Sequence, residues 1–349
     1  MKAEIAIYRQ DNCLNIVLLE DGQAVEWLCD ADKTTIRRQD IILGKVTQVS
    51  AALASVFIDI GDSHDAILPL TEAPAKVKAG QQLIVQIRRL TADSKGHQAT
   101  TRIRLAGPFA VYNPKGKSKP RSRLTAFDAA HQQAFFTADL QRLEQTWRQI
   151  DEQAVSGPVP RVLIPLGEPL HAALLRLITA ETVKIRVEGE ELFSRVYNLV
   201  QDLMPIYTPL LDLHVPRGGY GLAAVLGLGT LPDEVSRRKI WLKSGGFIVI
   251  DPTEAMTVID VNSGKDTRGG ENDALRLRTN CEAAAEIARQ LRLRNTGGCI
   301  VIDFLNMASE EDQGKVVETM RQSLARDKAK SRIYGFTSMG LLEMTRSDR

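Results

Sequence analysis

The sequence predicts a multi-domain α/β protein, and three patterns in it support this fold class. Short segments that alternate apolar and polar residues, as half-buried strands do, fill the first third of the 349-residue chain. Helical spacing begins near residue 131, and the last third contains two apolar strands, GGFIVID and GGCIVID, with a helix between them. Strands that alternate with helices predict a layered α/β arrangement.

Composition is typical of a folded protein of the cytoplasm. Hydrophobic residues make up 44% of the chain and charged residues 25%, which excludes global disorder. The N-terminus lacks the unbroken apolar run of a signal peptide or a membrane span, so we expect a cytoplasmic protein without a membrane partner. The net charge of +2 neither requires nor excludes a nucleic-acid partner. The scattered cysteines form no CxxC pair, which predicts reduced, mostly buried thiols and no zinc site: Cys13, Cys29, Cys281 and Cys299.

The N-terminal third predicts a hairpin followed by a small barrel. Asp21 and Gly22 form a two-residue turn between two alternating segments, which is a strong hairpin signal. Five short strands follow over residues 41–107, and they predict a barrel of the oligonucleotide-binding type.

A basic segment, NPKGKSKPRSR at residues 113–123, separates the barrel from a long helix. Its composition predicts an exposed linker without regular structure. Its cations either contact phosphates or are simply solvated: Lys115, Lys117, Lys119, Arg121 and Arg123. The helix after it is predicted from an apolar stripe: Phe136, Leu140, Leu143 and Trp147.

Two aspartates end apolar strands on either side of the predicted C-terminal helix. Asp260 ends MTVID and Asp303 ends GGCIVID, a connectivity that places strand ends near each other at the carboxyl edge of a sheet. Carboxylates are ligands that Mg²⁺ takes, and a bound ion can activate water against a phosphodiester. Asn262 would face the same side and orient a carboxylate or a water. The alternative is that strand-end aspartates only cap turns or helices, and Asp251 is interpreted in that way.

The helix predicted over residues 272–294 has an apolar and a basic face. Its apolar stripe consists of Leu277, Cys281, Ala284, Ala288 and Leu291. Its arginines either hold an RNA backbone or form a solvated face: Arg276, Arg289, Arg292 and Arg294.

Three segments resemble the catalytic region of the ribonuclease E/G family: TEAMTVIDVNSGK, NCEAAAEIARQLRLRNTGGCIVIDF and GFTSMGLLEMTR. GKVTQVSAALASVFIDIGDSHDAILPL resembles the ribosomal-S1-type barrel of that family. The resemblance implies an RNase H-like scaffold interrupted by an S1-type OB barrel, with a C-terminal DNase I-like α/β catalytic subdomain. The implied boundaries are 1–35 for the first part of the RNase H-like domain, 36–112 for the barrel, 113–123 for the linker, 124–238 for the rest of the RNase H-like domain and 239–349 for the catalytic subdomain.

The resemblance also implies a function and site residues. The chain would be an Mg²⁺-dependent endoribonuclease, with Mn²⁺ as an alternative metal, that cuts single-stranded rRNA or mRNA to 5′-phosphate and 3′-hydroxyl products. Asp260 and Asp303 would hold the metal, and Asn262 would assist them. In the barrel, Phe57 would stack on a base, while Lys95 and Arg37 would contact the RNA.

The sequence departs from the family pattern at several positions. The family's second barrel aromatic is Ile67 here and a nearby tyrosine is Ile60, so part of the stacking platform is absent. No Arg-Thr sensor segment for a 5′-monophosphate follows the barrel, and Lys330 replaces a supporting arginine. The chain ends at MTRSDR without the family's CPxC zinc link, so we expect no zinc and no zinc-linked oligomer.

Two other classes of function are compatible with this sequence. A non-catalytic RNA-binding or ribosome-associated protein of the same family is the main alternative, against which the presence of Asp260, Asn262 and Asp303 argues. A DNA nuclease is the other, and it would still cut a substrate that lacks every 2′-hydroxyl.

Overall fold

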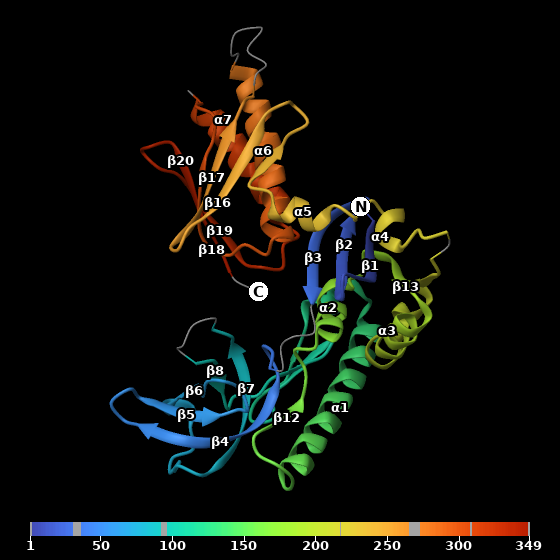
Figure 1. Ribbon diagram of the computed structural model, residues 1–349, viewed down its shortest axis with the longest axis vertical. Coiled ribbons are helices and arrows are strands. Elements are labelled where there is room, and N and C mark those ends of the chain that lie inside the picture. The colour runs from blue at the N-terminus through green and yellow to red at the C-terminus, as the bar shows by residue number, and fades with distance from the viewer. Residues whose placement is uncertain are drawn as a thin grey trace. The chain divides into compact units, whose positions relative to one another are not determined.

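The computed structural model describes residues 2–30, 36–91, 96–216, 218–264, 273–307 and 309–347, and it is a mixed α/β structure as predicted (Figure 1). The chain divides into two compact units, one formed by Met1–Ile16 with Leu28–Val215 and the other by Val17–Trp27 with Pro216–Arg349. Within the described ranges, no helix has both the length and the apolar character that crossing a membrane requires.

The N-terminal strands form the predicted hairpins. A five-stranded sheet has the order β14-β13-β1-β2-β3, in which β13 runs parallel to both of its neighbours, β1 and β14. Asp21 and Gly22 have φ angles of 48° and 82°, the positive values that a tight hairpin turn of this type needs. The bounds are β1 Ala3–Gln10, β2 Cys13–Glu20, β3 Gln23–Asp30, β13 Thr182–Glu188, β14 Leu211–His214, α2 Pro169–Leu177, α3 Glu190–Leu203 and η3 Pro205–Leu210.

Five strands close into the predicted barrel. Each strand pairs with its neighbours in the order β4-β5-β6-β8-β7, and β7 pairs back to β4. This order, with β6 parallel to β8, is that of an OB-like barrel. The bounds are β4 Ile41–Ser50, β5 Ser55–Asp59, β6 Ala66–Pro69, η1 Leu70–Glu72, β7 Gln82–Arg89 and β8 Gln98–Thr100.

The barrel sheet also contains a strand that the sequence does not assign to it. β12, Arg161–Ile164, pairs antiparallel with the first residues of β4. β5 pairs only with Lys45–Ser50, so the edge of β4 next to Ile41 is left for β12. A strand more than fifty residues beyond the barrel therefore extends its sheet, which local patterns do not predict.

The basic segment after the barrel is more ordered than predicted. It contributes β11, Lys119–Pro120, to a small sheet with β9, Leu105–Ala106, and β10, Ala110–Tyr112, and η2 follows at Ser122–Ala126. The prediction of a linker without regular structure is wrong at its C-terminal end. The reason is that Arg121 donates to the carbonyl of Gly107 at 2.8 Å and Arg123 donates to Sδ of Met204 at 3.1 Å. Arg123 is half-buried in this packing, and burial lowers its pKa to about 10.

The long helix follows as predicted, as α1, Ala129–Ala154. Asp128 caps it by accepting a hydrogen bond from the backbone N–H of His131 at 3.0 Å. The predicted stripe packs into one core with strands of the barrel sheet: Phe136, Leu140, Leu143 and Trp147.

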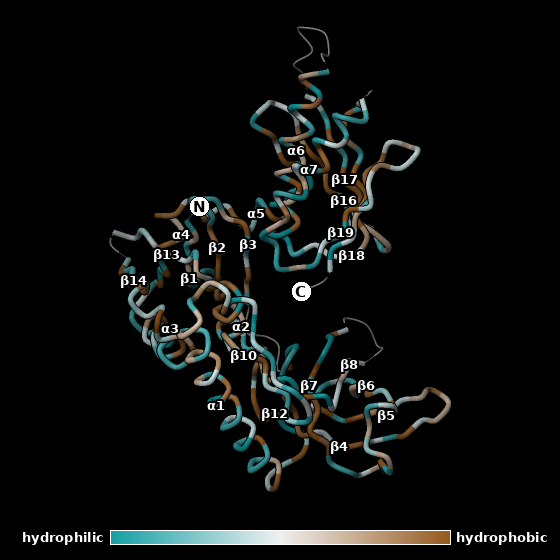
Figure 2. The backbone as a smooth tube through the Cα atoms, turned by 180° about the vertical axis from the view of Figure 1, so that it is seen from behind, coloured by the Kyte–Doolittle hydropathy of each residue, from teal (hydrophilic) through white to brown (hydrophobic). Residues whose placement is uncertain are grey.

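The second unit is built on a six-stranded sheet of order β15-β16-β17-β18-β20-β19. The bounds are β15 Lys239–Trp241, β16 Phe247–Pro252, β17 Met256–Asn262, β18 Gly298–Asp303, β19 Ser331–Phe336, β20 Leu341–Arg346, α4 Leu222–Val225, α5 Leu231–Ser236, α6 Asp273–Leu293 and α7 Glu310–Leu324. Side chains of α6 and α7 share one apolar core with one face of the sheet, whose apolar strand segments are brown in Figure 2. The predicted stripe of α6 lies in or against this core, which confirms the helix and its orientation.

The cysteines differ from the prediction in their burial. All four are free thiols, but Cys29 and Cys299 are exposed and Cys13 and Cys281 are half-buried. The expectation of mostly buried thiols is therefore wrong. Strand alternation explains Cys299, because its neighbour Ile300 takes the inward position.

Candidate active site

The two predicted aspartates lie side by side on the sheet of the second unit. β17 and β18 run parallel, and Asp260 and Asp303 are direct partners in their register. Ile259 and Ile302, the residues just before them, are fully buried in the core, so the alternation of side chains turns both carboxylates to the opposite, exposed face. Because neighbouring strands lie about 4.8 Å apart, the two carboxylates can bind one ion together.

Asn262 lies next to this pair and faces the same side, as predicted. Its Nδ2 donates a hydrogen bond to Oδ2 of Asp260 at 2.7 Å. This bond fixes the orientation of the Asp260 carboxylate and leaves its other oxygen available to a ligand.

A third aspartate on the same sheet has a different role. Asp251, on β16, accepts a hydrogen bond from Nη2 of Arg238 at 2.6 Å, and this contact lowers the pKa of Asp251. It pairs in register with Val258 and not with Asp260. The prediction of a local cap is therefore wrong, because Asp251 on β16 forms an ion pair with Arg238, the residue just before β15.

Arg238 brings a positive charge close to the carboxylates. The contact with Asp251 is the main cause of a raised pKa of Arg238, and the charge of Asp260 adds to this rise. The sequence analysis does not single out this arginine, because its partners become visible only once the strands are paired.

The donor set fits a hard divalent cation. Two carboxylates in a solvent-accessible position, one of them oriented by the amide of Asn262, suit Mg²⁺, which keeps several waters and uses one or two protein carboxylates. Among the described residues, no group of three or more His, Cys, Asp and Glu side chains is placed to hold a metal ion. Two carboxylates are the number of protein ligands that Mg²⁺ often uses when waters and substrate complete its coordination.

The barrel residue Phe57 lies on the outside of the barrel. Val56 and Ile58, on either side of it, are buried in the barrel core, and Phe57 is half-buried on the other face. Its register partner Ile67 faces outward with it, whereas Ile60 is part of the core. Phe57 is therefore not part of the barrel core.

The two other predicted RNA contacts have different outcomes. Nη2 of Arg37 pairs with Oδ2 of Asp30 at 3.0 Å, and the Arg37 side chain is only 19% exposed. Lys95 lies outside the residues that the structure describes.

Other cations gather on the barrel around a polar pocket of about 330 Å³. Glu72 lies in it at 3.8 Å from Arg88 and 3.6 Å from Arg102. Both arginines are more than half exposed, so the pocket presents positive charge at its surface. Its lining contains four arginines: Arg38, Arg88, Arg102 and Arg104.

Three of the four arginines predicted on this helix or just after it are bound within the protein. Arg292 is 5% exposed and pairs with Glu20 at 2.7 Å and Glu26 at 3.5 Å. Arg289 pairs with Glu286 at 2.6 Å, and Arg294 donates to a main-chain carbonyl at 2.7 Å. Both interpretations from the sequence are therefore wrong for these three arginines, since each is bound to groups of the protein itself. Arg276 pairs with Asp273 at 3.9 Å.

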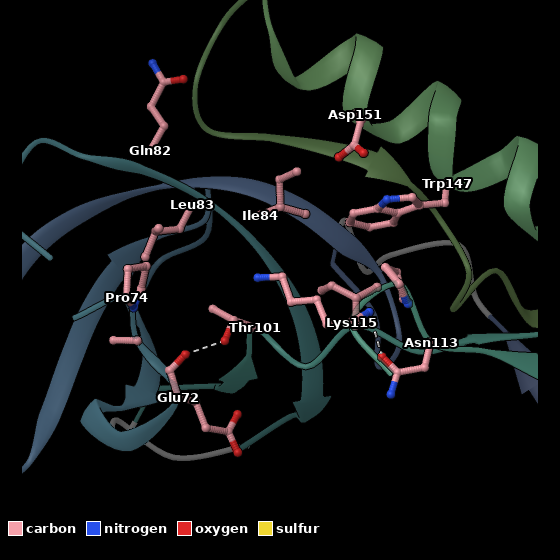
Figure 3. A pocket seen from close by; sticks show the side chains of 13 residues that line it. Glu72, Pro74, Gln82, Leu83, Ile84, Thr101, Asn113, Lys115, Trp147 and Asp151 are labelled. Atoms are coloured by element: carbon pink, nitrogen blue, oxygen red, sulfur yellow. Dashed lines mark hydrogen bonds between the residues drawn. The ribbon is translucent and has the colours of Figure 1, made fainter. Parts of the chain in front are cut away.

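A pocket of about 430 Å³ lies elsewhere, between the barrel and α1. Figure 3 shows Trp147 and Asp151 extending from α1 over β7, the strand that carries Leu83 and Ile84. Its lining mixes apolar and polar residues, among them Lys115 of the basic segment, and it contains neither of the two aspartates nor Phe57. We therefore place the candidate active site at Asp260 and Asp303.

Comparison with known proteins agrees with the features above. A family model described as the Ribonuclease E/G family matches residues 123–349, the part of the chain that contains both aspartates. The chain belongs to the ribonuclease E/G family. The match confirms the resemblance drawn from the three C-terminal segments.

Curated relatives of this ribonuclease E/G family member cover most of its length. Ribonuclease E of Nostoc sp. is 32% identical over 350 residues, which cover 88% of this chain and 50% of that protein. Ribonuclease E of Haemophilus influenzae is 27% identical over 390 residues, covering 99% of this chain and 42% of that protein. Ribonuclease G of Escherichia coli is 30% identical over 357 residues, which cover 88% of this chain and 72% of that protein. The chain thus spans about half the length of the ribonuclease E relatives that it matches.

Proposed function

We propose that this chain is an endoribonuclease that hydrolyses single-stranded RNA with the help of Mg²⁺ or Mn²⁺. The observation that carries the proposal is the pairing of Asp260 with Asp303 on neighbouring parallel strands, with Asn262 bonded to Asp260. Ribosomal or messenger RNA in processing or decay is the proposed substrate. Within this proposal, residues 239–349 form a DNase I-like catalytic subdomain, and the sheet of β1, β2, β3, β13 and β14 belongs to an RNase H-like scaffold.

The side chains have separate tasks in the proposed reaction. Asp260 and Asp303 hold the cation, which supplies positive charge next to the phosphodiester and lowers the pKa of water. Asn262 keeps Asp260 oriented through its 2.7 Å hydrogen bond. A water oxygen forms a bond to phosphorus, the bond to the 3′ oxygen breaks, and that oxygen takes a proton. The products are a 3′-hydroxyl and a 5′-phosphate.

The barrel supplies RNA binding in this proposal. Phe57 offers an outward aromatic face, and every base can stack on such a face. The arginine pocket around Glu72 adds positive charge that can neutralise phosphates. We assign Arg37 a supporting part, because its pairing with Asp30 limits its contact with RNA.

Cleavage of a labelled, AU-rich single-stranded RNA tests the proposal. We expect cutting with Mg²⁺ or Mn²⁺ and none with excess chelator, and products that a 5′-phosphate-dependent exonuclease degrades. A DNA of the same sequence should stay intact, and cutting of the DNA would favour the DNA-nuclease alternative. Substrates with a 5′-monophosphate and a 5′-hydroxyl should be cut at the same rate if the chain has no 5′ sensor. Binding without any cutting would favour the non-catalytic RNA-binding alternative.

Replacing Phe57 with alanine is expected to weaken RNA binding by about 5- to 100-fold, because stacking of one base on an aromatic side chain is lost. Phe57→Tyr keeps the ring and should bind within about threefold of the wild type. Fluorescence anisotropy with a labelled RNA in the absence of divalent ions measures both. Equal loss in the two variants would show that Phe57 acts through packing and not through stacking.

A further inference from the structure

The exposed sheet face that carries the carboxylates also carries an aromatic pair. Trp241 on β15 pairs in register with Phe247 on β16, and Phe247 pairs in register with Asn262 on β17. Ile240 and Ile248, the neighbours of these aromatics, point into the core, so both rings lie on the same face as Asp260 and Asp303. A continuous row therefore runs from Trp241 through Phe247 to Asn262, which is bonded to Asp260.

The pair has the geometry of a stacking platform whose outer ring, Trp241, is exposed. The two ring centroids lie 5.3 Å apart with an interplanar angle of 64°, an edge-to-face arrangement in which Phe247 supports Trp241. Trp241 is 64% exposed, whereas large aromatic side chains usually bury most of their surface. Neither ring belongs to the apolar core of this unit.

A cation lies over both rings. Nζ of Lys239 is 4.2 Å from the ring centroid of Trp241 and 3.5 Å from that of Phe247. Lysine is a flexible point charge, and it can move from the rings to a phosphate while a base takes its place on the aromatic face. An aromatic face and a mobile cation are the two parts of sites that bind single-stranded nucleic acids.

We propose that Trp241 and Phe247 stack a nucleobase of the RNA next to the bond that is cut, and that Lys239 contacts the adjoining phosphate. This inference rests on the proposed function and adds to it a base-binding subsite beside the carboxylates. β15 lies two strands from β17, or about 10 Å, so a nucleotide on Trp241 is close to a phosphate held at Asp260 and Asp303. Stacking does not select one base strongly, so the subsite orders the strand without fixing its sequence.

The test compares two enzymes on intact RNA and on RNAs that each lack one base. Trp241→Ala and the wild type are compared on the RNA substrate and on a series that carries a single abasic nucleotide moved along the strand. We expect Trp241→Ala to lower kcat/KM by about 5- to 100-fold on intact RNA, and Trp241→Phe to recover most of that loss. When the abasic nucleotide lies at one position beside the cut, the wild type and Trp241→Ala should have equal kcat/KM, because the base that stacks on Trp241 is already missing.

Tyr334→Ala is the matched control. Tyr334 is also an exposed aromatic with a cation near its ring, 4.9 Å from Arg332, but it lies on β19 at the opposite edge of the sheet. It should change kcat/KM by less than about twofold and should show no abasic position at which it equals the wild type. A loss for Trp241→Ala that stays the same on every abasic substrate would overturn the proposal.

Two further measurements separate the possible failures. RNA binding is measured by fluorescence anisotropy, with Trp241→Ala added to the Asp303→Asn variant. This measurement tests stacking without any cleavage. A wild type that cuts no RNA would therefore refute the proposed hydrolysis and leave the stacking proposal to be decided by binding. Equal RNA affinity of Trp241→Ala and its parent would refute the subsite. The mass in solution is measured by sedimentation, and dissociation of an oligomer by Trp241→Ala with unchanged RNA affinity would assign this face to a second copy of the chain instead.

Discussion

Asp303→Asn is expected to lower kcat for RNA cleavage by about 100- to 1,000-fold. RNA affinity and fold should change little. The asparagine keeps the size of the side chain and removes the negative charge. Asp303 is exposed on the open face of the sheet, so no buried partner loses its counter-charge and the strand pairing with β17 and β20 should persist. Single-turnover cleavage with saturating enzyme separates the chemical step from binding.

The controls follow from the positions of other side chains. Glu318→Gln removes an exposed carboxylate from α7, which packs on the covered face of the sheet, and it should retain full activity. Asn262→Ala should lower kcat by a smaller factor, about 10- to 100-fold, because it orients a ligand and does not bind the metal itself. Asp303→Asn with near-normal kcat, or an effect as large from Glu318→Gln, would contradict the assignment of the carboxylate pair.

Much of this site could be predicted from the sequence because strand alternation determines it. Each aspartate follows a buried isoleucine, Asp303 at the end of its strand and Asp260 two residues before the end of β17, so the side on which each carboxylate lies is fixed by the residue before it. The helix α6 between the strands makes them parallel neighbours, which brings the two strand ends to one edge. These are local rules applied to long, regular elements, where such rules work best.

The parts that could not be predicted depend on partners distant in the sequence. Arg292 is a surface residue by its chemistry, yet Glu20, from the N-terminal hairpin, draws it into a buried ion pair. β15 is three residues long, so its alternation is too short to indicate that Trp241 faces the same side as Asp260. β12 joins the barrel sheet only because β5 leaves part of β4 unpaired. In each case the decisive contact is made by a segment that no local pattern connects to the residue.

Another such contact lies at the end of the second unit and has the largest expected effect on stability. Arg346, the last residue of β20, and Asp327 have fully buried side chains, and Nε of Arg346 donates to Oδ2 of Asp327 at 2.6 Å. Nη1 of Arg346 donates to the carbonyl of Thr296, just before β18, also at 2.6 Å. The guanidinium therefore ties together three segments of the unit that are separated in the sequence.

Arg346→Met is expected to destabilise this unit by about 3–5 kcal/mol, because it leaves the buried carboxylate of Asp327 without its counter-charge. Hydrogen exchange measured on peptides checks the value, since each 1.4 kcal/mol corresponds to about a tenfold loss of protection in amides that open with the unit. Peptides from β18 and β20 should lose protection. Barrel peptides from β4 and β7, which belong to the other compact unit, serve as an internal control and should not change.

The double variant Arg346→Met with Asp327→Leu distinguishes an ion pair from simple packing. Removing both charges eliminates the unpaired carboxylate, so the double variant should be more stable than Arg346→Met alone, even though it carries one more substitution. If the destabilising effects of the two substitutions instead add, the loss of stability in Arg346→Met comes from lost packing and from the lost hydrogen bond to Thr296. The coupling free energy between the two substitutions therefore measures how much the buried ion pair stabilises this unit. β20, which Arg346 ends, pairs in register with β18, the strand that carries Asp303.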